Sequence, residues 1–78
     1  MATIETSEPQ NTADGLAAVV ALRRLADVLE ATQVERALRE GWSWSDIAEA
    51  LGVTRQAVHK KHAKRVAEAG IETRRRGV

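Results

Sequence analysis

The sequence has no cysteine, a single proline and only two aromatic residues, both tryptophan, among its 78 residues. Without cysteine the chain can form neither a disulfide nor a thiolate-bound zinc site, and it cannot use thiol catalysis. No apolar run approaches the roughly 20 residues that cross a bilayer, and no basic segment followed by an apolar one marks a signal peptide. These absences predict a cytoplasmic chain that is long enough for one small domain.

The sequence also lacks the residue sets of enzymes and cofactor sites. Ser43 and Ser45 have no arrangement of histidine or aspartate around them that would make either a nucleophile, and there is no glycine-rich phosphate loop. His59 and His62 have a spacing that can hold a metal, but no third ligand lies nearby and two lysines separate them. We expect a protein that is not an enzyme and that binds no metal or other cofactor.

Charge is divided unevenly along the chain, although the formal net charge is only +1. Residues 1–54 hold four basic and nine acidic side chains, a balance of −5, whereas residues 55–78 hold eight basic and two acidic ones, a balance of +6. A cationic C-terminal third on an acidic body favours a polyanionic partner such as nucleic acid. A solvated charge run that ends in a disordered tail would have the same composition, and charge alone does not separate the two interpretations.

Composition divides the chain into three parts. Residues 1–12 are polar, contain the proline and show no periodicity, which predicts a disordered arm. Residues 13–70 are rich in good helix formers and show no sustained alternation of apolar and polar residues, so we expect an all-α domain. Within it, residues 13–31 are predicted to form an extra helix suited to dimerisation, and residues 32–70 a compact helical unit. Residues 71–78 are predicted to form a basic tail.

Capping signals predict four helices in the all-α domain. Thr32 and Glu35 have the spacing of a capping box, in which a hydroxyl and an acid each accept a backbone amide, and Ser43 and Asp46 repeat it. Glycine is typical of the residue that follows a helix. The predicted helices run from about residue 14 to 30, from 33 to 40 before Gly41, from 44 to 51, and from the cap Thr54 to Gly70.

Hydrophobic phase supports a break between the first two predicted helices. In a continuous helix Leu22 and Leu29 would share one side, whereas Val34 and Leu38 would lie about a third of a turn away from them. Either the helix breaks near residue 31, or one long helix serves two surfaces. We expect the break, although the segment around it contains no strong helix breaker.

One stretch has the features of two crossing helices joined by a tight turn: SWSDIAEALGVTRQAVHKKHAKR, residues 43–65. Ala48 is small where the second helix crosses closely, and Gly52 suits a turn that needs positive φ. This stretch resembles the bacterial helix-turn-helix family of DNA-binding proteins, especially the C-terminal tri-helical domain of sigma factors and of small actinobacterial-type transcriptional regulators. Residues 33–40 would supply the preceding helix, and residues 1–30 are not covered.

The resemblance implies that residues 55–65 form the recognition helix, whose N-terminal half enters the major groove of DNA. Arg55 can pair bidentately with guanine and Gln56 with adenine, and basic side chains and helix N-termini commonly bind phosphate. His62 departs from the Leu or Phe that similar domains usually carry, and we expect its ring to cap the core. Base reading is predicted for Arg55 and Gln56. His59 and Lys60 are also predicted to read bases, with a phosphate contact equally open. Phosphate contacts are predicted for Thr54, Lys61, Lys64, Arg65, Arg74, Arg75 and Arg76.

Apolar residues lie on nearly all sides of the first predicted helix. Such a helix needs burial on two sides, and a unit of three helices covers only one of them. Two-fold dimers are the commonest oligomers, so we predict a homodimer; a merely alanine-rich surface with a few exposed leucines is the alternative. The predicted dimerisation residues are Leu22, Leu25, Val28 and Leu29.

The fold predicted from these patterns is all-α, a tri-helical helix-turn-helix domain preceded by an extra N-terminal helix. The predicted function is sequence-specific binding of double-stranded DNA by a small bacterial transcriptional regulator, cytoplasmic and associated with the nucleoid. Two alternatives stay open: a protein-interaction adaptor, such as an antitoxin or a sigma-like accessory, and a DNA-architectural protein of a phage or mobile element. Salt-dependent DNA binding would separate the first alternative, and a sequence-specific footprint with little bending would separate the second.

Overall fold

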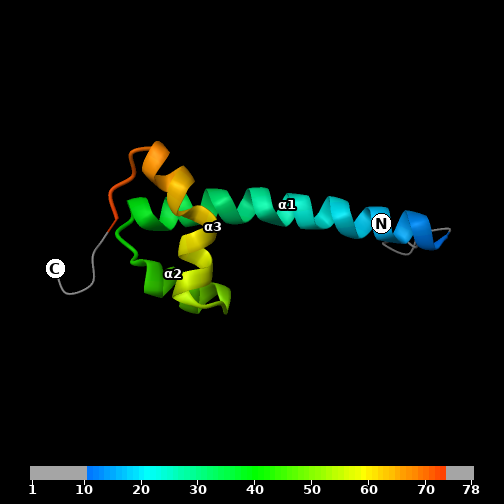
Figure 1. Ribbon diagram of the computed structural model, residues 1–78, viewed down its shortest axis with the longest axis horizontal. Coiled ribbons are helices and arrows are strands. Elements are labelled where there is room, and N and C mark those ends of the chain that lie inside the picture. The colour runs from blue at the N-terminus through cyan, green and yellow to red at the C-terminus, as the bar shows by residue number, and fades with distance from the viewer. Residues whose placement is uncertain (1–10, 74–78) are drawn as a thin grey trace, which may run out of the picture.

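The computed structural model describes residues 11–73, which fold into three α-helices: α1 (Thr12–Arg39), α2 (Trp44–Leu51) and α3 (Arg55–Glu68). This part of the chain contains no strand, and the predicted all-α class is confirmed. α2 and α3 pack against the C-terminal end of α1, while the N-terminal part of α1 extends beyond them as a single helix (Figure 1). Among the described residues, no helix is both long and apolar enough to cross a membrane.

α1 begins inside the segment that was predicted to be a disordered arm. The side-chain oxygen of Asn11 accepts the backbone N–H of Asp14 at 2.8 Å, which caps the helix, and Thr12 is its first residue. Asparagine is among the preferred N-cap residues, and its role here was not foreseen. The remainder of the predicted arm, residues 1–10, lies outside the described residues, as do Arg74, Arg75 and Arg76 of the predicted tail.

The predicted break near residue 31 is wrong, because α1 is continuous over 28 residues. The hydroxyl of Thr32 does not cap a new helix; it donates to the backbone carbonyl of Val28 at 3.1 Å, one turn earlier in the same helix. The extra N-terminal helix and the first helix of the tri-helical unit are therefore one element. The change of hydrophobic phase near residue 31 therefore reflects the alternative stated above, in which one long helix supplies two surfaces.

The caps predicted for the two shorter helices are confirmed. Ser43 and Asp46 form a reciprocal capping box with two bonds of 3.0 Å at the start of α2, and Thr54 Oγ1 accepts the backbone N–H of Ala57 at 3.0 Å at the start of α3. Between them the chain reverses at Gly52, whose φ of 73° is left-handed. The backbone N–H of the residue after Gly52 then bonds back to the carbonyl of Ala48 at 3.0 Å. This turn fixes how α3 leaves α2.

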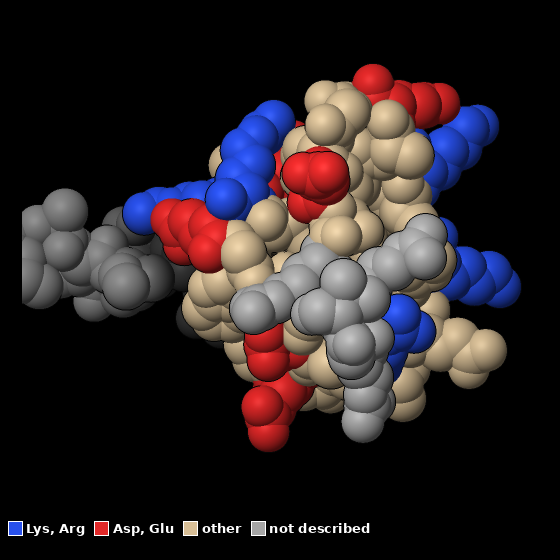
Figure 2. All heavy atoms as spheres, turned by 90° about the vertical axis from the view of Figure 1, so that its left-hand side faces the viewer, with Lys and Arg blue, Asp and Glu red and all other residues tan. Residues whose placement is uncertain are grey.

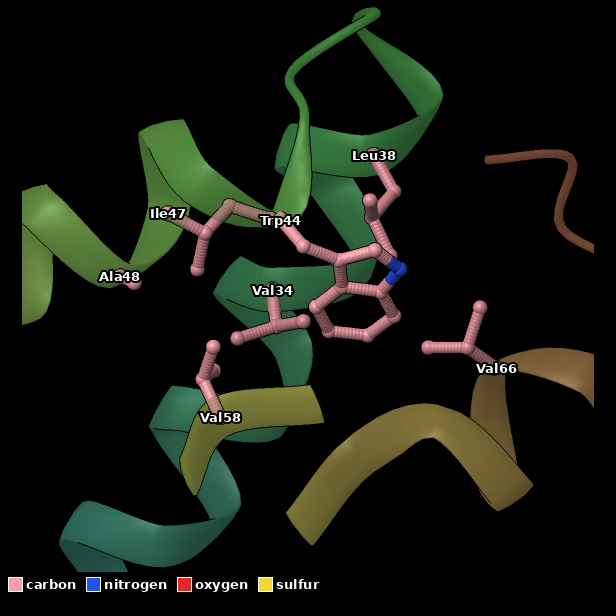
Figure 3. Close-up of a cluster of buried hydrophobic side chains, with 7 residues drawn as sticks. All are labelled: Val34, Leu38, Trp44, Ile47, Ala48, Val58 and Val66. Atoms are coloured by element: carbon pink, nitrogen blue, oxygen red, sulfur yellow. The ribbon is translucent and has the colours of Figure 1, made fainter. Parts of the chain in front are cut away.

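The core lies where the three helices meet, and every helix contributes to it. Trp44, only 5% exposed, is its largest apolar side chain and projects among residues from all three helices (Figure 3). Ala48 is buried at the crossing of α2 and α3, as its small size indicated. The buried apolar residues are Val34 and Leu38 from α1, Trp44, Ile47 and Ala48 from α2, and Val58 and Val66 from α3.

Candidate nucleic-acid interface

α3 has a buried face and an exposed basic face. Val58, His62 and Val66, spaced four residues apart, point into the core. On the opposite side of the helix, Gln56, Lys60 and Lys64 form an exposed row with the same spacing. Among residues 11–73 neither lysine of this row makes an ion pair. We name Gln56, Lys60 and Lys64 the outer row.

The start of α3 adds further donors beside the outer row. Arg55 is the first residue of the helix and is exposed. The first turn contains no acidic residue, so no carboxylate there opposes the partial positive charge that a helix carries at its N-terminus. The hydroxyl of Thr54 is committed to capping the helix. A phosphate contact by Thr54 would therefore use its backbone amide more readily than its side chain.

His59 lies on the side of α3 that faces α2. Its ring meets the indole of Trp44 edge-on, with ring centroids 5.0 Å apart and an angle of 75° between the planes. The other histidine, His62, is buried and lies four residues after Val58, on the side of α3 that faces the core. Because it contacts Trp44 and is still exposed, His59 lies at the border of the exposed basic face. Its predicted base contact stays a prediction. Among the described residues, no group of three or more potential metal ligands occurs.

Lys61 and Arg65 occupy the side of α3 that faces α1. Lys61 Nζ lies 3.1 Å from Asp27 Oδ1 and 3.2 Å from Glu30 Oε2, and Arg65 Nε lies 2.7 Å from Glu35 Oε2. The hydrogen bond to Asp27, with that to Glu30 next in size, raises the pKa of Lys61 above its ordinary value of 10.5. The phosphate contacts predicted for Lys61 and Arg65 stay predictions. They would require these two side chains to bind the carboxylates of α1 and a phosphate at the same time.

A buried polar link between α1 and α3 was missed by the sequence reasoning. His62 Nε2 lies 2.6 Å from Glu30 Oε2, and His62 Nδ1 lies 2.8 Å from Arg65 Nη2. Arginine has only donors, so Nδ1 is the accepting nitrogen and Nε2 donates to Glu30. That bond is the main cause that lowers the pKa of Glu30 below its ordinary value of 4.5, and Lys61 adds to it while burial acts against it. His62 therefore joins helices rather than merely capping the core with its ring edge.

The acidic residues of α1 therefore neutralise one side of α3 and leave the other side cationic. Asp27, Glu30 and Glu35 all bond to the side that carries Lys61 and Arg65. Arg55, Lys60 and Lys64 make no ion pair among the described residues. Seen from the end of the molecule where α2 and α3 lie, several basic side chains project from the right-hand edge (Figure 2).

The four predicted dimerisation residues lie on the projecting part of α1, away from the helix-turn-helix core. Each is more than half exposed: Leu22 and Leu25 at 65%, Val28 at 66% and Leu29 at 57%. They share one broad side of the helix. The structure therefore leaves them accessible, and the homodimer stays a prediction.

Comparison with known proteins agrees with this geometry. A family model described as a homeodomain-like domain, of the helix-turn-helix class, matches residues 18–74. The chain belongs to this helix-turn-helix family of DNA-binding domains, as the resemblance of residues 43–65 indicated. The match begins within α1 and includes both shorter helices.

Curated relatives come from mycobacteria. Uncharacterized proteins of Mycobacterium tuberculosis and Mycobacterium bovis are each 37% identical to the chain over 60 residues, which is 77% of this chain. The chain spans only 24% of the length of these relatives. No solved structure matches the chain.

Proposed function

We propose that the protein binds double-stranded DNA sequence-specifically as a small transcriptional regulator, with α3 in the major groove. The observation that carries the proposal is the outer row of α3, an exposed basic face on the second helix of a helix-turn-helix pair. Such helices read base edges with the side chains of their first turns. A non-enzymatic role fits a family that acts by binding.

The exposed side chains of α3 are proposed to fall into two groups, those that read base edges and those that bind the phosphate backbone. Arg55 and Gln56, in the first turn, are suited to guanine and adenine edges respectively. Lys60, one turn further along, borders both groove and backbone. Lys64 lies two turns beyond Gln56 on the same side, where a phosphate contact fixes register without reading sequence. The basic residues after residue 73 would add nonspecific attachment.

A homodimer formed through the exposed side of α1 completes the proposal. Two copies related by a two-fold axis would present two recognition helices to a pseudo-palindromic site. The exposed leucines of α1 support this, because an isolated apolar surface of this kind is rarely left uncovered on a monomer. The same surface favours the second candidate function, a protein-interaction adaptor in which α1 binds a different protein.

The test is a binding titration with labelled duplexes, using a site obtained by selection from random DNA and a scrambled duplex at fixed salt. The double variant Lys60→Ala/Lys64→Ala should bind both duplexes at least tenfold more weakly than the unaltered chain. The matched control is Arg23→Ala/Arg24→Ala, which removes the same charge from the exposed part of α1 and should bind as the unaltered chain does. No selected site and no effect of the α3 variant would overturn DNA binding and favour the adaptor.

A further inference from the structure

Asp27 lies in the exposed N-terminal part of α1, before the region where the three helices share a core. Its Oδ1 nevertheless accepts a hydrogen bond of 3.1 Å from Lys61 Nζ of α3. Both side chains are open to solvent, that of Lys61 at 49% and that of Asp27 at 63%. An ion pair this exposed adds little to stability, so the fold does not depend on it.

Lys61 has a second partner, Glu30, which is bound more firmly than Asp27. Glu30 Oε2 lies 3.2 Å from Lys61 Nζ and also accepts a hydrogen bond of 2.6 Å from the buried His62. The carboxylate of Asp27, by contrast, bonds to Lys61 alone within residues 11–73. Arg23, one turn earlier on the same side of α1, makes no ion pair with it. Asp27 is therefore the partner that Lys61 can exchange without disturbing the core.

Lys61 also lies on the flank of α3 that faces a phosphate backbone in the proposed complex. An α-helix with its side chains is about 10–12 Å across and the major groove is about 12 Å wide, so a helix in the groove borders phosphates on both flanks. Lys61 follows Lys60 of the outer row and lies about 100° around the helix from it, next to α1. A DNA phosphate and the carboxylates of α1 therefore compete for the same ammonium group.

The charge on this flank opposes a phosphate. One ammonium group is bonded to two carboxylates, which gives Lys61, Asp27 and Glu30 together a charge of −1. The bond to Asp27 is the largest cause that raises the pKa of Lys61, with the bond to Glu30 next. Lys60 and Lys64, in the outer row, make no ion pair among the described residues. Of these three lysines, Lys61 alone must give up a carboxylate before it binds DNA.

We propose that Asp27 withholds Lys61 from the DNA backbone and thereby limits the affinity of α3 for DNA of any sequence. This inference rests on the proposed function and adds to it a positioning residue whose removal strengthens binding. A phosphate contact carries no sequence information. Withholding one therefore weakens binding to all duplexes alike and leaves the preference set by Arg55 and Gln56 unchanged.

The variant Asp27→Asn tests this inference, because it removes the charge and keeps the shape of the side chain. Titrations on the selected and the scrambled duplex, at several salt concentrations, should show binding to both that is about two- to fivefold tighter. The fall of log affinity with log salt should steepen by about 0.9, the value of one new phosphate contact. An unchanged slope for Asp27→Asn would overturn the inference.

The matched control is Asp14→Asn, which removes the same charge from the same helix. Asp14 lies 13 residues before Asp27, or about 20 Å along the axis, which is beyond the screening length of about 10 Å at 0.1 M salt. It should leave the slope of the unaltered chain in place. Both variants should keep the helical circular dichroism of the unaltered chain, since both positions are exposed.

A second pair of variants tests whether Asp27 acts through Lys61. In a Lys61→Gln chain, Asp27→Asn should no longer steepen the slope, whereas in a Lys60→Ala chain it should keep its full effect. Steepening that persists without Lys61 would overturn the inference. Salt-dependent binding by the unaltered chain with no effect of Asp27→Asn removes this inference alone, whereas a chain that binds neither duplex, with or without Asp27, removes the proposed function as well.

Discussion

His62 of α3 and Glu30 of α1 are joined by a hydrogen bond of 2.6 Å between Nε2 and Oε2, although 32 residues separate them in sequence. The histidine is 2% exposed, and the glutamate also binds Lys61 at 3.2 Å. The link holds the middle of α3 to α1. It therefore fixes the direction in which the outer row faces.

Replacing His62 should measure the contribution of this link to stability. His62→Ala leaves a cavity and removes the hydrogen-bond partner of Glu30, and should lower the free energy of unfolding by about 2–4 kcal/mol. His62→Leu refills the space with the residue type common in similar domains and should cost less, under about 1.5 kcal/mol. Urea unfolding followed by circular dichroism at one protein concentration is the measurement. Equal losses for the two variants would show that the hydrogen bonds, and not the packing, dominate.

The pH dependence of stability should show the same link. The folded-state pKa of Glu30 lies below its ordinary value of 4.5. Its contribution to stability is therefore fully present above about pH 4.5 and is lost as the pH falls through the lowered folded pKa. Glu30→Gln should remove that part of the loss of stability in acid. Glu49→Gln, an exposed acid of α2, is the control and should keep the wild-type profile. The measurement is unfolding in urea between pH 7 and pH 3.

Lys61 should add a dependence at high pH. Its folded-state pKa is raised above 10.5 by its bonds to Asp27 and Glu30. The stabilising contribution is present below about pH 10.5 and disappears as the pH rises through the raised folded pKa. Asp27→Asn removes the first of the two partners and should reduce this alkaline loss of stability. A profile unchanged by Asp27→Asn would show that the exposed ion pair contributes nothing measurable, as many surface pairs do.

Substitutions in the first turn of α3 should separate sequence reading from attachment. Arg55→Ala or Gln56→Ala should cost about 1–3 kcal/mol on the selected site and much less on scrambled DNA. Lys64→Ala should instead weaken binding to both duplexes nearly equally. The measurement is a titration of each variant on both duplexes at one salt concentration. If neither Arg55→Ala nor Gln56→Ala changes the affinity for the selected site while the chain stays folded, this helix does not read bases.

The salt dependence of binding should reveal the contribution of the basic tail. Affinity falls with salt, and each phosphate contact on duplex DNA steepens the fall of log affinity against log salt by about 0.9. Removing residues 74–78, with their three arginines, should reduce that slope by up to about 2.7 and weaken all DNA sequences similarly. Titrations at several salt concentrations give the slope directly. A slope unaffected by the deletion would exclude the tail from DNA contact.

Charged substitutions in the exposed N-terminal part of α1 should break the proposed dimer. Leu22→Glu combined with Leu29→Glu places two acids on the exposed apolar side of α1, and should yield a folded monomer, or an unfolded chain if the dimer is obligate. Sedimentation equilibrium and circular dichroism distinguish these results. A monomeric unaltered chain at high micromolar concentration would contradict dimerisation.

Local signals predicted the parts of the fold that local bonds create. The capping box of Ser43 and Asp46, the cap at Thr54 and the reversal at Gly52 each involve residues within a few positions of one another. Such bonds depend on residue type and spacing, which a sequence displays directly. Gln56, Lys60 and Lys64, each predicted as a DNA contact, are exposed in α3, as such contacts require.

Contacts between α1 and α3 were not predictable, because their partners lie 30 or more residues apart. The sequence assigned no partner to Glu30 and placed Glu35 in a capping box, yet the two bond to His62 and Arg65 across the fold. The predicted break failed for a related physical reason. Thr32 has the residue type of a cap, but within a helix its hydroxyl can bond to the carbonyl of Val28 instead. Sequence shows both possibilities, and only the packed helix selects between them.

The continuity of α1 has a genetic consequence. Because no loop separates the N-terminal part of α1 from the part that carries Val34, an inserted residue cannot be absorbed between them. One alanine added after Ala31 would rotate the N-terminal part of α1 by about 100° and shift it by about 1.5 Å relative to the helix-turn-helix unit. The effect of an insertion should therefore vary with its length, with the period of about 3.6 residues of an α-helix. One or two would turn the dimerisation residues of the proposed homodimer to another side, whereas seven, close to two full turns, would restore that side and lengthen the spacing between the half-sites it would bind.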